Sequence, residues 1–142
     1  MTVYEIPLII FQDLYWDTLI KAQKEIYPTE PESNKEYLNN FKWSTVTFIE
    51  DKEKVAGFCV WLSCTEPRTK EGFGTSLWLY VDPSYRNGLV TGKLLKAVER
   101  SAKSLGAKYF KWDINKDSAL IEAFDKRAEY KKESIIYSKE LI

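Results

Sequence analysis

Histidine is absent from this 142-residue chain. Its absence removes the commonest general base, the usual zinc ligand and every catalytic pair of serine or cysteine with histidine. A general base, if the chain has one, must therefore be a carboxylate, a tyrosine or a relayed water. Long apolar runs are also missing, because none approaches the ~18 residues of a membrane-spanning helix, and no signal peptide is visible. We therefore expect a cytoplasmic protein with no membrane partner.

Cysteine is scarce, and the two cysteines, Cys59 and Cys64, fall in one expected strand. Residues at that separation in a continuous strand lie roughly 16 Å apart, too far for a disulfide. The sequence therefore predicts free thiols in a reducing compartment.

An excess of charge of either sign is missing too, since 21 basic residues balance 21 acidic ones. This balance argues against nucleic-acid binding as the main task. The charge is nevertheless uneven, because residues 83–112 hold seven basic residues against the single acid Glu99. Two interpretations stay open: a solvated helix face, or a surface that attracts a polyanionic cofactor.

The stretch from Leu77 to Leu105 carries the clearest pattern. An apolar run, Leu77 to Val81, meets Pro83, which cannot donate to a strand ladder and so predicts a strand end. A short loop follows, and apolar residues then recur at helical spacing up to Gly106, a residue suited to the positive φ of a helix end. The unpaired N–H groups at the start of such a helix are a natural site for a phosphate.

This stretch resembles motif A of the Gcn5-related N-acetyltransferase (GNAT) superfamily. That motif is a strand ending in Val-x-Pro, then Tyr-Arg, a glycine-containing phosphate loop, and a helix carrying Leu-Leu. Val81-Asp82-Pro83, Tyr85-Arg86 and Leu94-Leu95 match it in register.

The glycines of the phosphate loop depart from this pattern. Leu89 and Thr91 occupy the two glycine positions, and Gly88 and Gly92 each stand one residue out of place. Glycine allows the main chain to approach a phosphate closely because it has no Cβ. Small phage-encoded GNAT-like proteins carry degenerate loops of this kind, so a viral source stays an open alternative.

The remaining elements fit the same family. Residues 1–142 are expected to form one α+β domain of the GNAT fold, a mixed sheet of about six to seven strands with about four helices. Expected strands cover residues 3–10, 44–50, 55–64, 77–81 and 108–114, with one or two more in 130–142. Expected helices cover residues 12–27, a short segment after Ser33, the basic stretch up to Leu105, and 119–127.

The resemblance implies an acetyl-CoA site between the strands 77–81 and 109–114, which splay apart in this fold. Main-chain groups near Tyr80 and Val81 would bind the pantetheine arm and the thioester carbonyl. The loop and first helical turn would hold the pyrophosphate, and an asparagine after the later strand would touch the arm. The implied cofactor-binding residues are Tyr80, Val81, Arg86, Asn87, Gly88, Leu89, Val90, Thr91, Gly92 and Asn115, the last with a turn-forming role as its alternative.

The catalytic groups are less well matched. Family members often place a tyrosine in the last helix to protonate the leaving thiolate, and Phe124 stands at that position. Asp113 is the candidate general base, because burial at the end of a strand would raise its pKa. Glu66 and Glu71 lie in the loop before the expected strand 77–81, where a substrate would enter, and solvated side chains are their simpler interpretation.

Three functions follow from these observations. The first is transfer of an acetyl group from acetyl-CoA to an amine, on a small molecule or on a protein, with no metal. The second is an inactive GNAT-fold protein that serves as a binding or structural component, in a phage virion or as an effector on a host protein. The third, a nucleic-acid adaptor, rests on the alternation Tyr109-Phe110-Lys111-Trp112. A homodimer or a protein partner stays open in each case.

Overall fold

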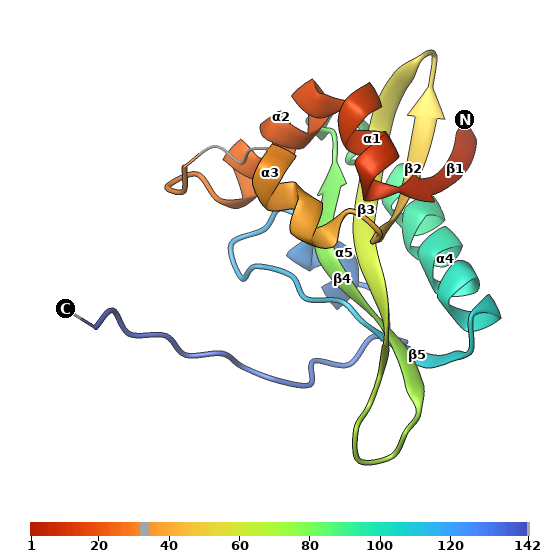
Figure 1. Ribbon diagram of the computed structural model, residues 1–142, viewed down its shortest axis with the longest axis vertical. Coiled ribbons are helices and arrows are strands. Elements are labelled where there is room, and N and C mark those ends of the chain that lie inside the picture. Colours follow the sequence, from red (N-terminus) through yellow and green to blue (C-terminus); the bar gives the residue numbers. More distant parts are fainter. Residues whose placement is uncertain (32–34, 142) are drawn as a thin grey trace.

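The computed structural model describes residues 1–31 and 35–141, which form one twisted five-stranded sheet with helices on both faces (Figure 1). The strand order is β1-β2-β3-β4-β5; β1 to β4 pair antiparallel and β5 runs parallel to β4. The strands are β1 (Thr2–Pro7), β2 (Thr45–Asp51), β3 (Lys54–Thr65), β4 (Gly72–Val81) and β5 (Ala107–Lys111). The expected mixed sheet of the GNAT fold is confirmed, with fewer strands than the sequence predicted.

The expected hairpin of β2 and β3 turns at Lys52 and Glu53. Both residues adopt positive φ, 51° and 65°, which is the conformation of the two central residues in a type I′ turn. This turn matches the twist of the flanking strands and sets the pairs Asp51–Lys54 and Glu50–Val55. A bulge at Ala56 then shifts the register by one residue, so that Phe48 faces Phe58.

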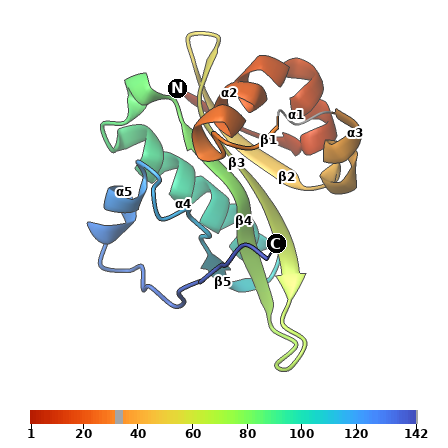
Figure 2. The ribbon, with the colours of Figure 1, turned by 90° about the vertical axis from the view of Figure 1, so that its left-hand side faces the viewer.

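The sheet buries one apolar cluster on each face. The helix α4 (Leu89–Ser104) packs Leu94, Leu95 and Val98 against one face, together with Trp61 and Val81. Figure 2 shows α4 on one side of the strands and α1 and α2 on the other. On that second face Phe11 and Leu19 pack against Phe58 and Tyr80. The apolar spacing of the basic stretch therefore predicted the buried face of α4 correctly.

The N-terminal helices differ in detail from the expectation. The single helix predicted over residues 12–27 is divided at Tyr15 into α1 (Leu8–Leu14) and α2 (Trp16–Ile26), and α1 begins directly after Pro7. The early helix places both Leu8 and Phe11 in the core on the face of the sheet that α1 covers. The expected short helix is present as α3 (Lys35–Leu38), followed by the 3₁₀ turn η1 (Asn39–Phe41), and Ser33 lies outside the described residues.

The C-terminal part departs most from the expectation. β5 ends at Lys111, three residues before the predicted end, and α5 is a short helix, Ile121–Asp125. The strands predicted in residues 130–142 are wrong for the part that the structure describes, because residues 131–141 contain neither helix nor strand. This segment, here called the C-terminal tail, runs outward from the domain in Figure 1.

Candidate functional site

The parallel strands β4 and β5, at one edge of the sheet, pair over a short length and then separate. The β4–β5 ladder joins Gly72–Thr75 with Ala107–Lys111 and goes no further. A Cβ on Gly74 would lie 2.4 Å from the ring of Phe110, so only glycine lets the two strands approach this closely. One more link follows, from the amide of Asp113 to the buried Ser76 hydroxyl oxygen at 2.9 Å. The β5-facing main chain of Leu77–Val81 is therefore left without a strand partner among the described residues.

A β-bulge coincides with this separation. Val60 and Trp61 of β3 face Trp78 and Ser76 of β4, so Leu77 is an extra residue on the β4 side. A bulge bends its strand and increases the local twist. The bulge at Leu77 therefore lies just beyond the last β4–β5 pair, Thr75 with Lys111, where the two strands stop pairing.

The loop after β4 is anchored by Asp82, which is buried. Its carboxylate accepts hydrogen bonds from the Ser84 hydroxyl at 2.6 Å and the Ser84 amide at 3.0 Å, and it pairs with the ammonium groups of Lys21 at 3.1 Å and Lys54 at 3.5 Å. Burial alone would raise the pKa of Asp82, but the Ser84 hydrogen bonds and Lys21 outweigh it and hold that pKa well below its usual range. Asp82 is therefore ionised at neutral pH. Its hydrogen bonds and ion pairs hold the loop in place where β4 ends.

Arg86 is engaged by protein groups. Its Nη2 donates to both carboxylate oxygens of Glu25 on α2, at 2.6 Å and 2.5 Å, and its Nε donates to the carbonyl of Val81 at 2.8 Å. Its guanidinium also lies 5.9 Å from the centre of the Tyr80 ring. Arg86 thus ties α2 to the end of β4, and the side chains of Tyr80 and Val81 belong to the two core clusters. The Tyr80 hydroxyl is buried and has no hydrogen-bond partner among the described residues, and the Val81 carbonyl already accepts from Arg86, so the other main-chain groups of these two residues are the ones left for a ligand.

In the first turn of α4, where the phosphate site is expected, only a few main-chain amides remain free to bind a ligand. Gly88 has φ of 94°, which favours glycine, and precedes Leu89, whose side chain is 59% exposed and points to solvent. The amide of Leu89 donates to Asn87 Oδ1 at 3.1 Å, and the amide of Gly92 donates to the Gly88 carbonyl at 3.0 Å. The helix rule leaves the amides of Val90 and Thr91 without an intrahelical acceptor.

Arg127 also reaches this turn, and the sequence analysis missed it. A Cβ on Gly92 would lie 3.1 Å from Arg127 Nη2, so the guanidinium rests against the first turn of α4. The residue is half-buried and follows α5, 35 positions beyond Gly92 in the chain. In the sequence, the one indication of this contact is Gly92, which stands one residue from the glycine position of the family motif. A side chain at position 92 would push the Arg127 guanidinium away.

The predicted general base Asp113, the position of the missing tyrosine and the predicted cofactor ligand Asn115 have different environments. Asp113 lies beside Ser76, where the strands separate, but its side chain is exposed, so the expected burial is wrong. Phe124 is partly buried and packs between Trp112 and Tyr130, with ring centres 5.7 Å and 5.2 Å away, against the α4 cluster. Asn115 forms a turn, because its Oδ1 accepts from the Asp117 amide at 3.0 Å.

Tyr130 does not replace the missing tyrosine of the last helix. Its hydroxyl donates to Glu99 Oε2 at 2.6 Å, and the indole N–H of Trp112 donates to the same oxygen at 2.9 Å. Burial, and then the hydrogen bond to Glu99, raise the pKa of Tyr130. This tyrosine therefore ties the segment after α5 to α4. The alternation of residues 109–112 has a structural explanation too, because Phe110 and Trp112 pack in the α4 cluster.

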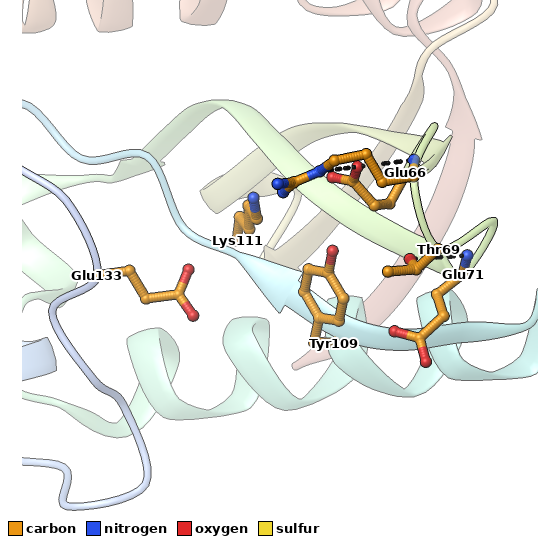
Figure 3. Close-up of a pocket in the computed structure, with 7 residues that line it drawn as sticks. Glu66, Thr69, Glu71, Tyr109, Lys111 and Glu133 are labelled. Carbon is orange, nitrogen blue, oxygen red and sulfur yellow. Dashed lines mark hydrogen bonds and ion pairs between the residues drawn. The ribbon is translucent and has the colours of Figure 1, made fainter.

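A separate hollow of about 270 Å³ lies beside the outer end of the β3–β4 hairpin and β5 (Figure 3). Its lining includes none of residues 77–92, so it is distinct from the separation of the strands. Glu66 in the hollow pairs with Arg68 at 3.2 Å, and hydrogen bonds from Arg68 hold the pKa of Glu66 below its usual range. The lining consists of Glu66, Arg68, Thr69, Glu71, Tyr109, Lys111 and Glu133.

The separated strands and the helix N-terminus together can accept an extended ligand that ends in phosphates. Main-chain groups of Leu77–Val81 can pair with an amide-bearing arm, and the amides at the start of α4, with Arg127, can hold anionic oxygens. Within residues 1–31 and 35–141, no group of three histidine, cysteine, aspartate or glutamate side chains is placed to hold a metal ion, and no helix is long and apolar enough to cross a membrane.

Comparison with known proteins gives a family and a set of similar folds. The model of the acetyltransferase (GNAT) family matches residues 10–127. No curated protein matches the sequence. An aminoglycoside acetyltransferase from an uncultured soil metagenomic sample, in complex with trehalose, superposes with a TM-score of 0.78 at 12% identity, covering 99% of this chain and 95% of that one.

Two further structures give the same result. A GNAT family acetyltransferase of Staphylococcus aureus has a TM-score of 0.72 at 13% identity, covering 99% of this chain and all of that one. A ribosomal-protein-alanine N-acetyltransferase of Brucella melitensis has a TM-score of 0.69 at 12% identity, covering 96% of this chain and all of that one. At these identities the likeness concerns the fold.

Proposed function

Since the chain belongs to the acetyltransferase (GNAT) family, we propose that it transfers an acetyl group from acetyl-CoA to an amine by direct attack. The observation that carries the proposal is the end of the β4–β5 ladder at Thr75 and Lys111, followed at once by the bulge at Leu77. It leaves strand-like main chain open along Leu77–Val81, which is the form of site that an amide-containing pantetheine arm requires.

The phosphate end of the ligand would lie at the first turn of α4. The amides of Val90 and Thr91 would donate to the pyrophosphate, favoured by the helix dipole, and Arg127 would supply a charge. Leu89 at a glycine position does not oppose this, because its side chain points to solvent. Of the residues expected to bind the cofactor, Arg86 and Asn87 would act indirectly, by shaping the loop through Val81, Glu25 and the Leu89 amide.

The reaction would take place where the strands separate. The amine nitrogen would attack the thioester carbon, the new C–N bond would replace the C–S bond, and coenzyme A would leave as a thiolate. A main-chain N–H near the Leu77 bulge would stabilise the oxyanion. Asp113 is held at this point through Ser76, and we propose it as the group that accepts the ammonium proton, directly or through water.

The acceptor class follows from the family and from its neighbours. One similar structure is an aminoglycoside acetyltransferase in complex with sisomicin, and another is named for the alanine of a ribosomal protein. Both names describe acceptors with an amine, so an amine on a small molecule or on a protein is the acceptor class that we propose here.

A matched pair of variants at position 89 tests the cofactor site. Leu89→Glu adds a negative charge to the first helical turn, whose amides would hold the pyrophosphate, and the exposed side chain and the helix N-terminus make the change harmless to folding. We expect acetyl-CoA to bind the wild-type protein in calorimetry and to raise its Tm. Leu89→Glu should weaken binding at least about tenfold through charge repulsion, and Leu89→Gln should weaken it far less.

Two results would contradict the proposal. Absence of both heat and thermal shift with acetyl-CoA would favour an inactive GNAT-fold protein that binds a partner. Equal binding of acetyl-CoA by the Leu89→Glu and Leu89→Gln variants would show that the phosphates do not bind at the start of α4. If acetyl-CoA binds, the rate of its hydrolysis or transfer with a panel of amines, in the wild-type protein and in Asp113→Asn, tests the catalytic role of Asp113.

A further inference from the structure

The loop between β4 and α4 contains the one Asn-Gly pair of the sequence, Asn87-Gly88. Both residues are exposed, and a Cβ on Gly88 would meet nothing within 4 Å. Within the described residues, the Gly88 N–H makes no hydrogen bond. Because glycine has no side chain, nothing shields this nitrogen from the side-chain amide of Asn87. Asparagine is one of the chemically labile residues of proteins, and this position leaves its side-chain carbon open to attack.

The side chain of Asn87 is held in an Asx turn, because its Oδ1 accepts from the Leu89 amide at 3.1 Å. This N–H polarises the side-chain carbonyl, and it would stabilise the oxyanion that forms there when a nucleophile adds to the carbonyl carbon. The first turn of α4 contributes in the same direction, since a helix N-terminus favours negative charge. The features that suit this turn to an anion therefore also favour attack on the Asn87 amide.

The geometry points to a site of self-modification: we propose that the main-chain nitrogen of Gly88 attacks the side-chain carbon of Asn87 and that Asn87 is thereby deamidated. A C–N bond forms between the two residues and closes a cyclic imide. The Gly88 nitrogen loses its proton, and the side-chain nitrogen of Asn87 leaves as ammonia. Water then opens the ring at either carbonyl, which gives aspartate or isoaspartate at this position. Solvent water is the co-reactant, and no electrons are transferred.

Deamidation places a charge where the cofactor phosphates would bind, and this consequence rests on the proposed function. An aspartate with a pKa of about 3.9 is ionised at neutral pH. Its carboxylate would lie at the first turn of α4, because the Asn87 side chain already reaches the Leu89 amide. There it would compete for the amides of Val90 and Thr91 and repel the pyrophosphate. The modification would therefore close the cofactor site in aged molecules.

Asn115 is a matched control within the same chain. It is exposed, and its Oδ1 also accepts the amide two residues on, that of Asp117 at 3.0 Å, but Lys116 follows it in place of a glycine. The full-length protein is incubated at mildly alkaline pH, and peptide mass spectrometry follows each asparagine. We expect deamidation at Asn87 at least about tenfold faster than at Asn115, because the Lys116 side chain shields the attacking nitrogen. Equal rates at the two residues would overturn the proposal.

Calorimetry with acetyl-CoA tests the consequence for the cofactor site. Asn87→Asp reproduces the charge and can still accept from Leu89, so it should weaken binding at least about tenfold by repulsion. Asn40→Asp adds the same charge at an exposed position on η1 and should bind as the wild type does.

Two calorimetric results have distinct meanings. Equal binding by Asn87→Asp and the wild type would overturn the proposed closure of the site. A wild-type protein that does not bind acetyl-CoA would instead refute the proposed function, and fast deamidation at Asn87 would still support the modification.

Discussion

Asp82 illustrates how one side chain sets the position of a whole loop. It is buried at the point where β4 ends, and it joins the loop backbone to the two lysines Lys21 and Lys54. The family motif contains a variable residue at this position, so the sequence pattern alone gave no reason to single it out. Its role comes from partners on α2 and β3, which are far away in the sequence.

The depressed pKa of Asp82 predicts an acid-sensitive fold. Because the folded-state pKa lies below the unfolded value of about 3.9, the stabilisation is complete above that value and is lost as the pH falls through the folded pKa. Asp82→Asn should lower the free energy of unfolding by about 1–3 kcal/mol at pH 7, through loss of charge-assisted hydrogen bonds.

The measurement is urea unfolding at several pH values between 7 and 3. The difference in stability between wild type and Asp82→Asn should shrink as the pH falls toward 3, and Asp125→Asn, at an exposed position, serves as the control. A difference that is independent of pH would show that Asp82 acts by its shape and not by its charge.

At the scale of elements, the junction of β4 and β5 depends on a glycine facing an aromatic ring. Gly74→Ala would place a Cβ 2.4 Å from the Phe110 ring, and overpacking of this kind costs about 1–3 kcal/mol. We therefore expect a lower Tm for Gly74→Ala. The double variant with Phe110→Leu should recover part of the loss, because the smaller side chain makes room, and additive losses in the double variant would refute the steric explanation.

The contact between α4 and the segment after α5 places a positive charge at the start of α4. Arg127 rests against Gly92 at the proposed phosphate site. Arg127→Ala should weaken acetyl-CoA binding by about tenfold, the effect of losing one charge-assisted hydrogen bond, with little change in kcat. Lys126→Ala, whose exposed ammonium pairs with Glu122 at 3.0 Å, is the matched control and should bind normally in the same calorimetric titration.

For the whole molecule, the sequence predicted the architecture well because its strongest signals are local. The β2–β3 hairpin, the strand before Pro83 and the amphipathic α4 all follow from periodicity and turn chemistry, and the family match confirms their assembly. The sequence did not predict the division of the N-terminal helix at Tyr15 or the absence of strands in residues 131–141. Both depend on tertiary contacts, which local periodicity does not report.

The candidate site was predictable only in part, for a related reason. The motif located the first turn of α4, but it could not show that Asn87 and Arg86 are engaged by protein groups. Arg127 and Ser76 reach the site through tertiary packing, and neither stands in a recognisable motif. The exposure of Leu89, which decides whether its bulk obstructs a phosphate, depends on where the helix begins.

The early end of the β4–β5 ladder has a consequence for how ligand occupancy can be observed. Amide protons on the unpaired side of Leu77–Val81 lack the strand partner that would slow their exchange with solvent, although the residues beside them are buried. An arm bound there would act as a temporary strand and protect them. Deuterium uptake in this single peptide would thus register the ligand even in a variant that has lost all turnover.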